Sequence, residues 1–120
     1  MAEHIDTGKK GENIAVEYLK NKGYAIYEQN WRHHHLEIDI IAAKNNELVI
    51  AEVKCRTGNP MVEPYLAVTR NKQNMLINAA NAYITKNNIN LDTRFDVIAI
   101  TLGKETKIEH IENAFYPRIR

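Results

Sequence analysis

Apolar residues recur along this chain with two different periods, which predicts both helices and strands. Helical spacing over residues 5–22 predicts a first helix, which Asp6 or Thr7 can cap. Gly23 follows it and can end it in a left-handed conformation. A second helix is expected over residues 69–86, with Thr69 as its N-cap.

Segments rich in β-branched and aromatic residues predict strands, and Asn45-Asn46 between two of them predicts a tight hairpin turn. The stretch with Gly58, Pro60 and Pro64 predicts a loop. The order α-β-β-β-α-β with a further edge strand predicts an α/β fold with a mixed central sheet and helices on its faces. The predicted strands are residues 24–31, 36–43, 47–54, 94–101 and 107–113.

Composition agrees with one globular unit. The chain has 120 residues, 44% of them hydrophobic and 26% charged, so we expect a single domain over residues 1–120 with its own core. The lone Cys55 rules out a disulfide scaffold. No apolar run approaches the roughly 18 residues that span a bilayer, and the first residues lack an apolar signal segment, so we expect a cytoplasmic protein without a membrane partner.

Total charge is nearly balanced, because 16 Lys and Arg face 15 Asp and Glu. This excludes a polycationic nucleic-acid coat. A local basic surface remains compatible with a formal net charge of +1. Its candidate members are Arg32, Lys54, Arg56, Arg70 and Lys72.

The two-residue turn fixes which residues of the hairpin face one another. Residues whose numbers add up to 91 become partners, so Asp39 should lie opposite Glu52, and Glu37 opposite Lys54. A side-chain period of two gives the strand two largely apolar faces. One face should carry Glu37, Asp39, Ile41 and Ala43, and the other Leu36, Ile38, Ile40 and Ala42.

An opposed carboxylate pair is unfavourable in a ladder unless a positive charge lies between its members. Asp39 and Glu52 have the oxygen ligands that Mg²⁺ or Mn²⁺ prefers. Lys54, two residues after Glu52, could orient a water or offset charge on a phosphoryl oxygen. This set suggests metal-assisted hydrolysis of a phosphodiester. Alternatively, Glu37 and Lys54 form an ordinary ion pair at the sheet end.

Each helix adds a polar residue to an apolar stripe. Glu12 shares a face with Ala15 and should point toward the sheet, with Gly8 and Gly11 allowing a close approach. It is either a third carboxylate of the site or a helix-end acid favoured by the helix dipole. Lys72, in the first turn of the second helix, is either a phosphate contact or a surface lysine.

Asp39, the Glu52-Val53-Lys54 tripeptide and Glu12 together resemble the PD-(D/E)xK nuclease superfamily. Almost the whole chain resembles, more narrowly, the YraN-like family of small bacterial proteins, which is similar to archaeal Holliday-junction resolvases. The matching segments are GKKGENIAVEYL (8–19), NWR (30–32), EIDIIA (37–42), AEVKCR (51–56), Lys72 and RFDVIAI (94–100).

This resemblance implies a restriction-endonuclease-like three-layer core and a nuclease-type site. Asp39 and Glu52 would be the metal ligands, Lys54 the catalytic lysine and Glu12 an accessory acid. The implied cofactor is Mg²⁺ or Mn²⁺, and the likeness to the resolvases makes a homodimer plausible.

Three further features are discounted as metal or nucleophile sites. Consecutive His33, His34 and His35 alternate sides on an extended chain, so a loop that touches DNA phosphates is the preferred interpretation. Cys55 alternates away from Glu52 and should be a small buried hydrophobe. Asp96 on a probable interior strand should hydrogen-bond Arg94 or Arg56, or cap the sheet end.

We therefore expect a Mg²⁺-dependent deoxyribonuclease, an endonuclease or a structure-selective DNA-processing enzyme. Its DNA contacts would come from basic residues around the acidic site. The alternative is a nucleic-acid-binding module of the same fold that lacks catalysis and acts through protein partners. The expected DNA-binding residues are Arg32, Arg56, Arg70 and Lys72.

Overall fold

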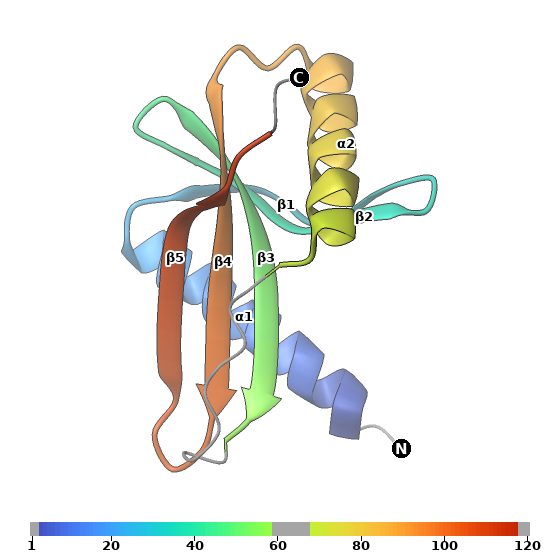
Figure 1. Cartoon of the computed structure of the whole chain (residues 1–120). Coiled ribbons are helices and arrows are strands. Elements are labelled where there is room, and N and C mark those ends of the chain that lie inside the picture. Colours follow the sequence, from blue (N-terminus) through green and yellow to red (C-terminus); the bar gives the residue numbers. More distant parts are fainter. Residues whose placement is uncertain (1–2, 59–67, 118–120) are drawn as a thin grey trace.

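The computed structural model describes residues 3–58 and 68–117, and in these ranges the chain forms two helices and five strands (Figure 1). Their order is the predicted α-β-β-β-α-β, followed by the edge strand. The predicted loop around Pro60 and Pro64 lies outside the described residues. The elements are α1 (Glu3–Asn21), β1 (Ala25–His33), β2 (Leu36–Lys44), β3 (Glu47–Thr57), α2 (Arg70–Asn87), β4 (Asp92–Leu102) and β5 (Lys107–Phe115).

Helix α1 ends as predicted but begins earlier. Gly23 follows it with a φ of 93°, a left-handed conformation that glycine adopts without strain. The helix starts at Glu3 rather than at a cap formed by Asp6 or Thr7. Neither glycine nor proline occurs between Glu3 and Thr7, so nothing in this stretch interrupts the helix.

Helix α2 has the predicted N-cap. The Thr69 hydroxyl accepts a hydrogen bond from the backbone N–H of Lys72 at 3.2 Å. At the other end Asn88 has a φ of 52°, and its backbone N–H returns to the carbonyls of the last turn. Local sequence signals therefore define both ends of this helix.

The five strands form one mixed sheet in the order β1-β2-β3-β4-β5. Only β3 and β4 pair in parallel, and the other neighbours are antiparallel. In Figure 1 α1 crosses behind the sheet and α2 lies in front of it. The predicted three-layer α/β architecture is confirmed.

Each helix covers its own apolar cluster. The α1-side core joins Ala15 and Leu19 to Ile40 and Ile98 of the sheet. The α2-side core joins Leu76, Ala79, Ala80 and Tyr83 to Ile38, Ile41, Leu48, Ile50, Phe95 and Phe115. Because burying a side chain of this size stabilises by about 1.5–3 kcal/mol, the two clusters together attach both helices to the sheet.

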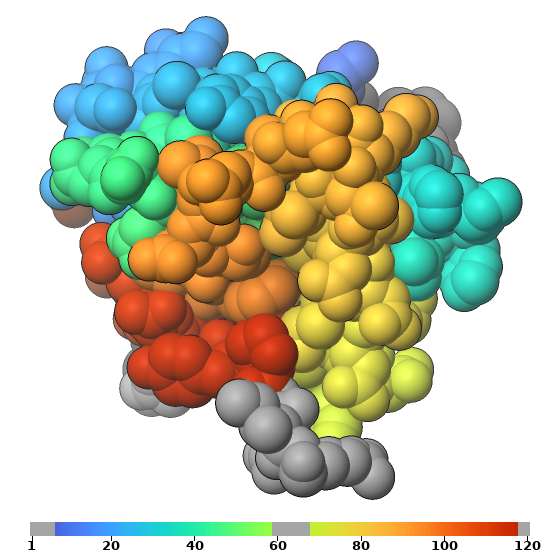
Figure 2. Space-filling model, turned by 90° about the horizontal axis from the view of Figure 1, so that it is seen from above, coloured from blue at the N-terminus to red at the C-terminus, as the bar shows by residue number. Residues whose placement is uncertain are grey.

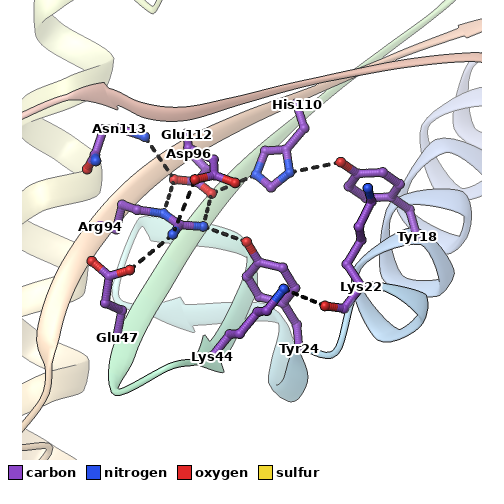
Figure 3. A network of polar contacts seen from close by, with 10 residues as sticks. All are labelled: Tyr18, Lys22, Tyr24, Lys44, Glu47, Arg94, Asp96, His110, Glu112 and Asn113. Atoms are coloured by element: carbon purple, nitrogen blue, oxygen red, sulfur yellow. Dashed lines mark hydrogen bonds and ion pairs between the residues drawn. The ribbon is translucent and has the colours of Figure 1, made fainter.

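A buried polar network lies within the β4–β5 half of the sheet (Figure 3). Arg94 binds both oxygens of Asp96, at 2.9 and 2.8 Å, and its guanidinium also donates to the Tyr24 hydroxyl at 2.6 Å. His110 Nε2 lies 2.7 Å from Asp96, and its Nδ1 lies 3.1 Å from the Tyr18 hydroxyl. Of the alternatives predicted for Asp96, the structure shows the bond to Arg94.

Asp96 is ionised within this network. Its side chain is 0% exposed, and burial alone would raise the pKa of the carboxyl group. Hydrogen bonds from His110 and Arg94, with the charge of Arg94, outweigh burial and hold the pKa of Asp96 below its usual value. The carboxylate therefore has a structural role. It links β4 to β5 through His110, and to Tyr24 before β1 through Arg94.

Helix α1 approaches β3 most closely at Gly11. A Cβ atom added at Gly11 would overlap the Cβ and Sγ atoms of Cys55, whereas one added at Gly8 would meet nothing within 4 Å. The predicted close approach is thus confirmed for Gly11 and wrong for Gly8. Cys55 packs against the α1-side core, on the face away from Glu52, as predicted.

We expect Gly11→Ala to destabilise the protein by about 1–3 kcal/mol, because the added methyl group must push α1 away from β3. Gly8→Ala is the matched control in the same helix, and it should be neutral or stabilising by up to about 1 kcal/mol through helix propensity. Urea unfolding followed by circular dichroism measures both. Equal stabilities for the two variants would contradict this close packing.

Candidate functional site

The hairpin of β2 and β3 forms with the predicted register. Asn45 and Asn46 have φ values of 51° and 69°, as a tight two-residue hairpin turn requires. The strands then pair from Lys44–Glu47 to Ile40–Ala51, always between residues whose numbers add up to 91. The turn therefore sets the register of this half of the hairpin.

The paired part of the hairpin ends at Ile40 and Ala51, one residue before the predicted acidic pair. Beyond this point β2 continues to pair with β1, and β3 continues to pair with β4. Leu36 and Ile38 pack with the α2-side core, while Ile40 lies in the α1-side core. The expected alternation of faces along β2 thus breaks at Asp39.

The break corrects one predicted contact. Glu37 does not face Lys54; its ladder partner is Arg32 of β1, and their side chains lie 3.6 Å apart. Since β2 has turned away from β3 here, Glu37 follows the β1–β2 hairpin instead. The ion pair that Glu37 forms is therefore with Arg32 and not, as the alternative had it, with Lys54.

Asp39 lies in the opening between β2 and β3. Its carboxylate accepts a hydrogen bond from the backbone N–H of Val53 at 2.8 Å, a group that no longer has a strand partner on this side. Glu52 lies against the same carboxyl group, and its charge and side-chain hydrogen bonding raise the pKa of Asp39. The two carboxyl groups therefore meet as predicted, although through a side-chain contact and not as a ladder pair.

This contact changes the protonation of Asp39. Burial, and then the charge of Glu52, raise the pKa of Asp39 from 3.8 to about 7, and the Val53 N–H and Lys72 offset only part of that rise. Near neutral pH Asp39 therefore carries a proton part of the time.

The two helices reach this opening from opposite faces of the sheet. Lys72 of α2 places its Nζ atom 3.5 Å from Glu52, whose side chain is only 14% exposed. From α1, Glu12 hydrogen-bonds Asn30 of β1. Burial raises the pKa of Glu12, and the charges of Asp39 and Glu37 raise it further. Three acidic side chains and one lysine thus gather where the hairpin opens.

Comparison with known proteins places this sequence in a family. The profile described as uncharacterised protein family UPF0102 matches residues 11–100, which include Glu12, Asp39, Glu52, Lys54 and Lys72. The chain belongs to the UPF0102 family. The predicted membership in a family of small bacterial proteins is thereby confirmed.

Relatives match along nearly their whole length. UPF0102 protein FP2501 of Flavobacterium psychrophilum is 50% identical over 117 residues, covering 97% of this chain and 98% of that protein. A UPF0102 protein of Bacteroides thetaiotaomicron is 47% identical over 119 residues, and one of Christiangramia forsetii is 45% identical over 117 residues. Each of these comparisons covers at least 97% of this chain and 98% of the relative.

The remaining predicted site residues of this UPF0102 chain are basic, and they differ in how exposed they are. Lys54 and Arg56 follow Glu52 on the same face of β3, and both are half-buried. Arg70 is exposed at the start of α2, and Arg32 is exposed on β1. The Nζ atom of Lys72 lies 3.5 Å from Glu52 and its side chain is 41% exposed. The phosphate contact and the surface lysine therefore both stay predictions.

Asn30 is a site residue that the sequence motifs do not single out. It lies on β1 between the ladder residues Gln29 and Trp31, has a φ of 51°, and its side chain lowers the pKa of Glu12 by hydrogen bonding. Asparagine tolerates positive φ better than most residues, so an asparagine inside a predicted strand is a usable signal.

The described part of this UPF0102 protein contains no cluster of three potential metal ligands. No group of three or more His, Cys, Asp or Glu side chains within residues 3–58 and 68–117 is arranged to hold an ion. Asp39 and Glu52 form the closest carboxylate pair of the site, with Glu12 at its edge. None of the described helices is long and apolar enough to cross a membrane.

We expect Asp39→Asn to make stability less dependent on pH. The folded protein holds a proton on Asp39 that the unfolded chain releases at lower pH, so its free energy of unfolding falls as pH rises from 3.8 to about 7. An asparagine keeps an acceptor for Val53 and offers an N–H to Glu52 without a charge.

Urea unfolding in EDTA at pH 5 and pH 8 measures this effect. The Asn variant should be as stable as the wild type at pH 5 and more stable at pH 8. Glu109→Gln, a change at an exposed carboxylate of β5, serves as control and should follow the wild type at both pH values. An Asp39→Asn variant less stable by about 1 kcal/mol at pH 8 would mean that ionised Asp39 stabilises the fold through Lys72.

Proposed function

We propose that this UPF0102 protein is a metal-dependent endonuclease that hydrolyses phosphodiesters in DNA. The observation that carries the proposal is the contact between Asp39 and Glu52, two carboxyl groups held together in a half-buried opening of the sheet. Two neighbouring carboxyl groups do not stabilise the fold, because burial of charged groups and repulsion between like charges both oppose folding.

The donor set fits a hard divalent cation. Mg²⁺ is commonly held by one or two carboxylates and keeps several of its waters, so a third protein ligand is not required. Asp39 and Glu52 would hold the ion, and Lys72, at 3.5 Å from Glu52, supplies a neighbouring positive charge. The bound ion would polarise a phosphoryl oxygen and lower the pKa of a water.

The other residues act on the substrate and on the water. Lys54 lies two positions beyond Glu52 on the same face of β3, where its ammonium group can hydrogen-bond a phosphoryl oxygen. Glu12, whose pKa is raised by burial, adds a carboxyl group at the α1 side that can orient water or exchange a proton with it. Arg32, Arg56 and Arg70 provide exposed or half-exposed cations for DNA phosphates.

The resemblance to the PD-(D/E)xK superfamily and to Holliday-junction resolvases supports the same assignment. Asp39, Glu52, Lys54 and Glu12 occupy the motif positions, and an α/β/α layering suits that fold. The competing function is a DNA-binding module without catalysis. The fold and the basic residues suit both functions, but only the nuclease needs the paired carboxylates.

We expect purified protein to cleave DNA in the presence of Mg²⁺ or Mn²⁺ and not in EDTA. Branched, single-stranded and duplex substrates should be compared on denaturing gels. Asp39→Asn should lower the rate at least about 100-fold, because it removes a charged ligand while keeping the hydrogen bond to Val53. Lys54→Ala should also lower the rate, and the exposed Glu109→Ala should leave it unchanged.

Two results would overturn the proposal. Cleavage that survives Asp39→Asn would come from another site or another protein. DNA binding without cleavage of any substrate in either metal would instead favour the non-catalytic module.

A further inference from the structure

The β1–β2 hairpin projects from the body of the molecule beyond α2. Its last ladder pair is His33–Leu36, and His34 and His35 form the turn, with a φ of 57° at His34. Figure 1 shows this loop extending past the end of α2, and Figure 2 shows the same segment protruding at the side of the space-filling surface. Both turn residues are exposed.

Aromatic rings continue from the core to this tip. Tyr83 of α2 meets Trp31 edge-to-face at 5.2 Å between ring centroids, which fixes the indole against the α2-side core. Trp31 and His33 are stacked, with centroids 5.9 Å apart and planes within 4°. His33 then meets His34 at 4.3 Å. The tip thus presents a row of flat side chains supported from beneath.

A cation lies on the opposite face of the same strand, because Arg32 alternates with Trp31 and His33 in the ladder. The Arg32 side chain is 72% exposed, and its partner Glu37, which is 39% exposed, lies 3.6 Å away. An exposed pair of this kind contributes little to stability, so a phosphate group can take the place of the carboxylate at small cost. Flat rings with a neighbouring exposed guanidinium are the combination that binds single-stranded nucleic acid.

The same strand connects this tip to the carboxylate pair. Asp39 follows His35 by four positions along the chain, a span of about 13 Å at about 3.3 Å per residue. A strand of duplex DNA advances about 3.4 Å per nucleotide, so this span corresponds to roughly four nucleotides of a stacked strand. An unpaired segment at the tip would therefore lie a few nucleotides from a phosphodiester at Asp39 and Glu52.

We propose that the side chains of Trp31, Arg32, His33 and His34 at the hairpin tip form a binding site for unpaired bases, and that the substrate is DNA in which a single strand adjoins a duplex. The inference rests on the proposed nuclease function and specifies its substrate class. The bases would stack on the rings of His33 and His34, and Arg32 would bind the adjoining phosphate. Blunt duplex DNA, whose bases are already stacked, offers the tip nothing equivalent.

Trp31 is the chain's only tryptophan, so its fluorescence reports directly on the tip. Binding should be measured in EDTA, which prevents cleavage and removes ions that histidines could bind. The probes are a single-stranded oligonucleotide, a duplex with one unpaired arm and a blunt duplex of equal length. The first two should change Trp31 emission and bind at least about five-fold more tightly than the blunt duplex.

Variants locate the effect on the rings. His33→Ala and His34→Ala should each weaken binding of the single strand about five-fold or more, as measured by anisotropy of a labelled oligonucleotide. His35→Ala, in the same turn but outside the ring contacts, is the matched control and should bind as the wild type does. Melting temperatures of all three should match that of the wild type, because these side chains lie at the tip.

The outcomes separate this inference from the nuclease proposal. Equal binding of all three DNAs, or an equal loss in His33→Ala and His35→Ala, would overturn the tip site even if Mg²⁺-dependent cleavage is present. Selective binding of unpaired DNA in EDTA, without cleavage in Mg²⁺, would support the tip site and overturn the nuclease.

Discussion

The end of the β2–β3 ladder at Ile40 and Ala51 is the constraint from which the candidate site follows. Where two strands part inside a sheet, the freed backbone groups still need hydrogen-bond partners. Asp39 satisfies the Val53 N–H with its carboxylate, and this bond brings the same carboxylate against Glu52. The opening also admits Glu12 from one helix layer and Lys72 from the other.

Two aspartates of this sheet, the buried Asp96 and the half-buried Asp39, have pKa values shifted in opposite directions. Asp96 is held by Arg94, His110 and the backbone N–H of Asn113, and its pKa is lowered. Asp39 has a single backbone donor and an acidic neighbour, and its pKa rises to about 7. The first carboxylate is satisfied within the protein, whereas the second has the perturbed pKa that is typical of functional sites.

Local rules were enough to predict the helices' ends near Gly23 and Thr69, the Asn45-Asn46 turn and the register of the paired hairpin. These features depend on backbone preferences of one to four adjacent residues. The meeting of Asp39 and Glu52 could also be predicted, because the turn places both strands correctly up to the residue before them.

The missed features depend on contacts between distant segments. The β2–β3 ladder ends before Asp39, and Ile38 lies in the α2-side core. Residue spacing within one strand reveals neither this change of face nor the pairing of Glu37 with Arg32. Likewise, Arg94 reaches Tyr24 across 70 positions of sequence. Gly8 and Gly11 look equivalent in the helix, and only the position of β3 distinguishes them.

The most direct test of the central claim is the location of Mn²⁺ in a crystal of the protein soaked with this ion. Manganese scatters anomalously, so its position can be assigned independently of the protein's own density. We predict one anomalous peak within about 2–2.5 Å of oxygens of both Asp39 and Glu52, and its loss in Asp39→Asn. Strong peaks elsewhere on the molecule, with the carboxyl groups of Asp39 and Glu52 still hydrogen-bonded to each other, would contradict it.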